Sequence, residues 1–154
     1  MRKEKETRQI REVQLSYSSN RENLLKDPIS SSKSAYEYLI KAFNENTIGL
    51  QEEFIALLLN RANKPIGAIK LHKGGLDSTI VDVRLLMAAA LKSATQGIIL
   101  AHNHPSGELK PSQADRNLTT KIKDACKILN IALLDHVIVS PFGNYMSFAD
   151  DGLI

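Results

Sequence analysis

The sequence has 154 residues, of which 43% are hydrophobic and 24% charged, as expected for a single soluble globular domain with a buried core. A net charge of +3 falls well short of a dedicated nucleic-acid-binding protein, and no apolar run reaches the roughly 18–20 residues that cross a bilayer. The charged start argues against a signal peptide, and a single cysteine excludes an internal disulfide. Both features favour a cytoplasmic location without membrane association.

Residues 1–47 are predicted to form an N-terminal extension. In its first eleven residues, five Arg and Lys outweigh two Glu, which indicates a solvated basic leader or, as the alternative, a weak arm for DNA or an acidic partner. Alternating polar and apolar residues predict a short strand over 12–17. The serines at 30–32 can cap a helix that runs to about Phe43. The apolar face of this helix is predicted to be Tyr36, Leu39, Ile40 and Phe43.

The main domain is predicted to span residues 48–154. Its first elements are two apolar segments, 54–59 and 66–71, which are separated by a turn-like stretch and predict a hairpin. A brief third strand is expected at 79–81. Good helix formers then predict a helix over 85–91.

The second half of this domain alternates strands and helices. Residues 97–101 are apolar throughout and predict a central strand that is covered on both faces. A helix is expected from Gln113 to about Leu129, followed by a strand over 131–139 and a last short strand over 145–148. This mixed order predicts an α/β or α+β class, with helices packed on a mixed sheet. The helix face toward the sheet is predicted to be Leu118, Ile122, Ala125 and Leu129, with Cys126 as a small buried hydrophobe.

Two histidines follow the predicted central strand, in the segment His102-Asn103-His104. Side chains two residues apart on a strand share a face, so both imidazoles can reach one ion. Asp115 follows Ser112 in the first turn of the next helix and can turn back toward the rings. Two His and one carboxylate leave the fourth tetrahedral position for water, which is the pattern of a catalytic zinc site. Such nitrogen and oxygen ligands favour zinc over Mn, Fe or Co, and they indicate hydrolytic chemistry.

A hydrolytic site also needs a base near the water, and both Glu52 and Glu53 are candidates at the start of the first core strand. The same residues also have simpler, purely structural interpretations. Ser112 to Asp115 is also a plain helix capping box, and two histidines can be ordinary loop residues. His136, in the strand over 131–139, is expected to be a core or hydrogen-bonded imidazole rather than a further ligand.

The motif string His-x-His-Pro, followed by Ser-x-x-Asp, resembles the metalloprotease signature of the JAB/MPN (JAMM) superfamily. The fuller string His-Asn-His-Pro-Ser-Gly-x-x-x-Pro-Ser-x-x-Asp is similar to its RadC-like branch. The likeness extends from about residue 52 to the C-terminus. Further matches are Glu-x-Phe at Glu52, Leu59-Asn60, Gly74-Gly75, Arg84, Leu134-Asp135-His136 and Ser147-Phe148-Ala149.

This resemblance implies a cytidine-deaminase-like mixed sheet wrapped by helices, and a zinc metallohydrolase that acts on peptide or isopeptide bonds in a peptide or protein substrate. It also places His136 or Asp135 beside the metal ligands. The roles that it carries over are zinc ligation by His102, His104 and Asp115, water activation by Glu52, and stabilisation of an oxyanion by Ser112.

The sequence departs from longer RadC-like proteins in two places. Those proteins carry an N-terminal helix-hairpin-helix module associated with DNA, and residues 1–50 show no convincing counterpart. The Pro-Arg pair that is common before the second helix reads Val83-Arg84 here. The alternative function is a DNA-associated accessory protein, linked to DNA repair or mobile elements, that uses the fold as a binding module. No feature of the sequence indicates an oligomeric state.

Overall fold

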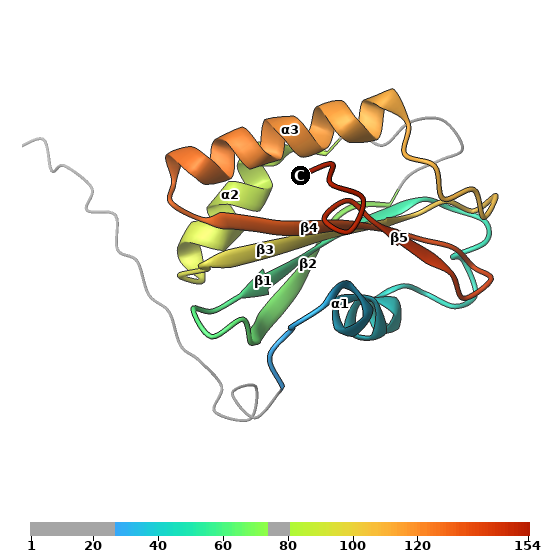
Figure 1. Ribbon diagram of the computed structural model, residues 1–154, viewed down its shortest axis with the longest axis horizontal. Helices are drawn as coiled ribbons and strands as arrows, with labels where there is room; N and C mark the ends of the chain where they lie inside the picture. The colour runs from blue at the N-terminus through green and yellow to red at the C-terminus, as the bar shows by residue number, and fades with distance from the viewer. Residues whose placement is uncertain (1–26, 74–80) are drawn as a thin grey trace, which may run out of the picture.

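The computed structural model describes residues 27–73 and 81–154. Five strands form one sheet in the order β2-β1-β3-β4-β5, in which β3 and β4 are parallel and the other neighbours antiparallel. Helices α2 and α3 cover one face of this sheet and α1 covers the other (Figure 1), which confirms the predicted class. The elements are α1 (Ser32–Leu39), a 3-10 turn (Ile40–Ala42), β1 (Glu53–Leu59), β2 (Pro65–Lys73), α2 (Val83–Lys92), β3 (Gly97–Asn103), α3 (Gln113–Ile128), β4 (Ala132–Val139) and β5 (Tyr145–Ser147).

The predicted hairpin and central strand are both confirmed. β1 and β2 pair antiparallel, with Leu59 opposite Pro65 at the turn. β3 lies between β1 and β4, and all seven of its residues are buried. The strand predicted over 12–17 and most of the one predicted over 79–81 lie outside the described residues.

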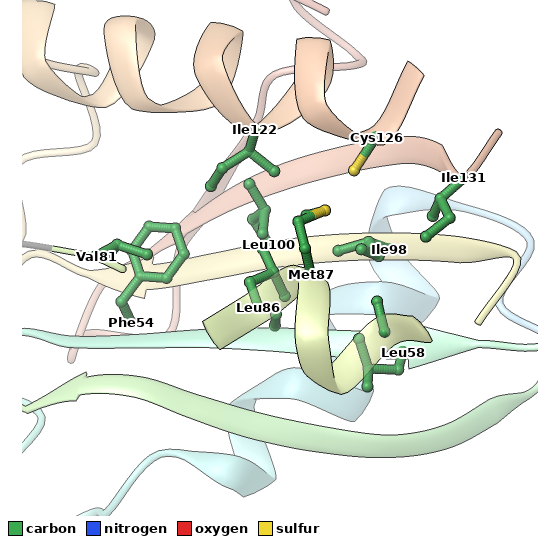
Figure 2. Close-up of a cluster of buried hydrophobic side chains, with 12 residues drawn as sticks. Phe54, Leu58, Val81, Leu86, Met87, Ile98, Leu100, Ile122, Cys126 and Ile131 are labelled. Carbon is green, nitrogen blue, oxygen red and sulfur yellow. The ribbon is translucent and has the colours of Figure 1, made fainter. Parts of the chain in front are cut away.

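Side chains of β1 and β3 alternate between the two faces of the sheet because successive strand residues point to opposite sides. On the α2/α3 face, Phe54 and Leu100 pack with Ile122 of α3 (Figure 2). On the α1 face, Leu57 and Ile99 pack with the helix α1. Helices therefore cover both faces of β1 and β3, the two strands that position the motif residues.

The buried face of α3 differs from its prediction. Thr119, Ile122 and Cys126 are fully buried, whereas Leu118 and Ala125 are only partly buried at the flank. The sequence prediction assigned the face to apolar residues alone. Thr119 lies inside because its hydroxyl has hydrogen-bond partners there, and buried hydroxyls are tolerated when they are paired.

Helix α1 is confirmed, although it ends at Leu39 rather than near Phe43, and the predicted face residues Tyr36 and Ile40 are only partly buried. Ser31 caps it through a capping box, and Leu39 and Phe43 are buried against the sheet. The boundary between an extension over 1–47 and a main domain over 48–154 stays a prediction. No helix within the described part of the chain is long and apolar enough to cross a membrane.

Candidate metal centre

Four side chains with metal-binding atoms meet on the α2/α3 face, where β1 begins and β3 ends. Glu52 precedes β1, His102 and His104 lie at and just after the end of β3, and Asp115 lies in the first turn of α3. The antiparallel register that pairs Phe54 with His102 brings the start of β1 beside the end of β3. One ligand atom from each of these four residues lies within 4.8 Å of all the others, so the cluster could hold a metal ion.

Both histidines turn the same ring nitrogen toward the cluster. The Nε2 atoms of His102 and His104 are 2.9 Å apart. The Nδ1 atom of His104 lies 2.6 Å from the carbonyl oxygen of Glu108. Because a carbonyl only accepts, Nδ1 of His104 carries the proton in this bond. When a metal is bound, a neutral His104 ring would therefore present its Nε2 atom as the ligand.

A tight turn after His104 brings the Glu108 carbonyl to this position. Gly107 has φ +82°, and a Cβ atom on it would lie only 2.5 Å from the ring of Phe142. Glycine meets both demands because it tolerates positive φ and has no Cβ. The Phe142 ring is otherwise 74% exposed and forms an apolar flank of the loop.

Asp115 both caps helix α3 and belongs to the candidate metal-binding cluster. From the sequence, these were two alternative interpretations of this residue. Its Oδ2 atom accepts hydrogen bonds of 2.7 Å from the backbone N–H and from the hydroxyl of Ser112, which completes a capping box. Its Oδ1 atom lies 3.2 Å from Nε2 of His102. Because the hydroxyl proton of Ser112 points to Asp115, oxyanion stabilisation by Ser112 stays a prediction.

The electrostatics of the cluster favour a cation. Burial disfavours the charged carboxylate of Asp115, but the adjacent side chains of His102 and His104 outweigh burial and hold its pKa well below the usual range. The nearby carboxylate of Asp115 also raises the pKa of His104, against the opposing effect of burial. The carboxylate is therefore ionised at neutral pH beside two imidazoles, as a metal ligand needs to be.

The two candidate bases lie on opposite faces of the sheet. Glu52 has its Oε1 atom 3.9 Å from Nε2 of His102. Glu53 is fully buried on the α1 face, where Lys70 Nζ lies 3.0 Å from its Oε2 atom and Thr47 donates to its Oε1 atom. Of these two carboxylates, the one at the cluster is that of Glu52.

The geometry fits a zinc ion with small adjustment. Two nitrogen ligands at 2.0–2.1 Å from a tetrahedral zinc ion lie about 3.3 Å apart, so the Nε2 atoms need to separate by only a few tenths of an ångström. A cavity of about 270 Å³ adjoins the cluster and gives access to it. Its lining residues are Glu52, Phe54, His104, Ser112, Ala114, Asp115 and Leu118.

Asn103, between the two histidines, supports the site from the α1 face. Its Oδ1 atom accepts from the backbone N–H of Glu53, and its Nδ2 atom donates to the carbonyls of Ile48 and Gln51. These bonds fasten the segment that leads into Glu52. No role for Asn103 was predicted from the sequence, although its amide lies between two candidate ligands there.

His136 is confirmed as a hydrogen-bonded core imidazole. Its Nε2 atom lies 2.8 Å from Nδ1 of His102, and its Nδ1 atom lies 2.6 Å from the hydroxyl of Thr119. Burial is the main cause that holds the pKa of His136 well below its usual value. Thr119 was not singled out from the sequence, although it lies one helical turn after Asp115.

A mixed sheet between helices, with this cluster at the strand ends, is the architecture of a metallohydrolase-type fold. The sequence pattern that describes the RadC-like JAB domain matches residues 29–153. The chain therefore belongs to the RadC-like JAB domain family, as the motif resemblance implied.

Bacterial relatives share most of this chain. A UPF0758 protein of Flavobacterium johnsoniae is 47% identical over 133 residues, which cover 86% of this chain and 56% of the relative. A UPF0758 protein of Porphyromonas gingivalis is 46% identical over 68% of this chain and 46% of its own length. One of Aquifex aeolicus is 36% identical over 82% of this chain and 52% of the relative. The chain thus spans about half the length of the curated relatives that it matches.

Proposed function

We propose that this protein is a zinc-dependent hydrolase that cleaves peptide or isopeptide bonds in a peptide or protein substrate. The observation that carries this proposal is the convergence of four ligand atoms within 4.8 Å, beside a cavity, in a chain of a metallohydrolase-type family. Histidine nitrogens and a carboxylate oxygen form the donor set that zinc prefers at catalytic sites. Zinc would be held by His102, His104 and Asp115.

Each residue of the cluster has a distinct part in this proposal. Zinc held there would supply Lewis acidity, which makes water more acidic near neutral pH. Glu52 would take a proton from the attacking water at its Oε1 atom and pass it to the leaving amine. Ser112 keeps Oδ2 of Asp115 occupied through two hydrogen bonds, while Oδ1 faces His102.

Hydrolysis is tested by supplying zinc-loaded protein with a mixed peptide library and with isopeptide-linked lysine peptides in water enriched in oxygen-18. Mass spectrometry should show cleaved products whose new carboxylates carry one heavy oxygen. Removal of zinc by a chelator should stop cleavage, and added zinc should restore it. Cleavage that continues without metal would overturn the proposal, and so would an absence of cleavage across both substrate classes.

A DNA-associated accessory role is the second candidate function. The observation that favours it is the basic stretch at 2–11, where five Arg and Lys outweigh two Glu. Binding through these charges should weaken steeply as salt rises, and it should survive the loss of a metal ligand such as His104. A gel-shift assay at low salt with duplex and single-stranded DNA tests this role, and no shift with either would remove it.

A further inference from the structure

His102 reaches the cluster as a ligand only if the proton of its neutral ring lies on Nδ1 and not on Nε2. For His104 the Glu108 carbonyl settles the same question directly. The partner of His102 Nδ1 is instead Nε2 of His136, at 2.8 Å. An imidazole nitrogen can donate or accept, so this contact alone does not fix the proton on His102.

His102, His136 and Thr119 form a chain of hydrogen bonds. The direction in which its donors point is fixed at the Thr119 end, on α3. The hydroxyl of Thr119 lies 2.6 Å from the backbone carbonyl oxygen of Asp115. Two oxygens at this distance need a hydrogen between them, and the carbonyl has none to give. Thr119 therefore donates to Asp115, and its hydroxyl oxygen accepts from His136 across their contact of 2.6 Å.

The remaining steps follow from the neutral state of His136. This ring is 0% exposed and lies between Phe148, which stacks on it at 4.7 Å, and the edge-on ring of Phe54. Burial among aromatic rings disfavours an imidazolium, so His136 carries a single proton. With that proton on Nδ1, its Nε2 atom is bare and accepts from Nδ1 of His102.

We propose that Thr119 and His136 are positioning residues that hold His102 in the tautomer whose Nε2 atom binds the metal. The relay of hydrogen bonds begins at Nδ1 of His102 and ends at the backbone of Asp115, which is itself a proposed ligand. It thereby couples the two ligands that come from β3 and α3. The inference rests on the proposed metal binding by His102 and is independent of any peptidase activity.

The test uses two substitutions of one hydroxyl. Thr119→Val keeps the shape of the side chain and removes the proton donor, whereas Thr119→Ser keeps the hydroxyl. Zinc affinity is measured by competition with a chromophoric chelator, and the tautomers are read from ring nitrogen-15 shifts, since the chain has only four histidines. We expect Thr119→Val to weaken zinc binding about 10- to 100-fold and to move the proton of His102 from Nδ1 toward Nε2. Thr119→Ser should restore both readouts.

A second pair of variants covers the case in which Thr119→Val does not fold. His136→Gln keeps a hydrogen-bond acceptor for Nδ1 of His102, whereas His136→Met removes it. Only His136→Met should weaken zinc binding and move the proton of His102 away from Nδ1. Equal affinity and an unchanged His102 tautomer in Thr119→Val or in His136→Met would overturn the relay. If the wild type took up no zinc, the proposed function would fail. The tautomers of metal-free wild type and Thr119→Val would then still decide on the relay.

Discussion

Polar residues lie on both faces of the sheet, and their partners differ. On the α1 face, Glu53, Asn103 and Asp135 are each committed to protein partners. The carboxylate of Asp135, for example, accepts from the hydroxyl of Ser147 and from two backbone N–H groups. Each of these side chains is satisfied by its own partners, and among the described residues they leave no ligand atoms turned toward a common point.

On the α2/α3 face, by contrast, atoms that could bind a metal point toward one another. The Nε2 atoms of His102 and His104 and the carboxylates of Asp115 and Glu52 face each other at 2.9 to 3.9 Å. Lone pairs that converge in this way repel unless a cation, either a proton or a metal, lies between them. Convergence of acceptors, rather than the mere presence of His and acidic residues, is what separates a candidate site from a structural network.

The largest expected effect is a difference in turnover between variants of the two neighbouring glutamates, Glu52 and Glu53. Glu52→Gln should lower turnover about 10²- to 10⁴-fold while zinc stays bound, because it removes the proposed proton acceptor. Glu53→Gln should leave turnover nearly unchanged, because this side chain faces away from the cluster and pairs with Lys70. Steady-state kinetics and metal analysis of both variants check this. Full activity in Glu52→Gln together with a dead Glu53→Gln would reverse the assignment of the base.

Asn103 tests whether the α1 face is structural. Asn103→Ala leaves one N–H and two carbonyls without their partner, so the free energy of unfolding should fall by roughly 2–4 kcal/mol. Asn60→Ala is the matched control, because that amide accepts from two N–H groups in an exposed hairpin turn. Denaturant unfolding should show the larger loss at Asn103, with about one zinc still bound. Equal losses at the two sites would contradict the account.

Two capping boxes give a smaller and sharper test. Ser31 caps α1 and Ser112 caps α3 with the same hydrogen-bond pattern. Replacing either with Ala should lower stability by about 1 kcal/mol. Only Ser112→Ala should also weaken zinc binding, because only this serine holds the carboxylate of Asp115. Thermal unfolding and zinc titration of the pair check this, and equal zinc affinity in both variants would show that Ser112 acts as a cap alone.

The smallest effect concerns Cys126, inside the core of the α2/α3 face. Burial raises the pKa of its thiol to about 11, so the folded state opposes ionisation that the unfolded state allows near pH 8.5. Stability should therefore fall as pH rises above 8.5, by about 0.8 kcal/mol at pH 9. Cys126→Ala should lack this part of the pH dependence in denaturant unfolding. Identical pH profiles would show that the thiol does not contribute.

Much of the fold was accessible from the sequence because its signals are local. Apolar runs of strand length and the capping serines specify elements that form where these residues stand. Three of the four cluster residues, His102, His104 and Asp115, could also be named from their spacing, whereas Glu52 was named only through the family resemblance. Sequence reasoning left Glu52 and Glu53 unresolved on chemistry alone, because one residue of strand register sends a side chain to the opposite face.

The supporting hydrogen bonds were less accessible because they join distant elements. Thr119 was not predicted to be buried because it is a polar residue on an otherwise apolar helix face. Its partner His136 comes close to it only when α3 packs on β4. In the same way, the contacts of Asn103 with residues 48–51 depend on the register of β1 against β3. These are contacts of tertiary structure, which local patterns do not encode.

The most direct test of the central claim is the zinc content of the purified protein, compared with that of His104→Ala. Elemental analysis should find about one zinc per chain in the wild type and almost none in the variant, while circular dichroism shows that the variant keeps its fold. No zinc in the wild type after incubation with the ion, or equal zinc in a folded variant, would contradict the metal centre.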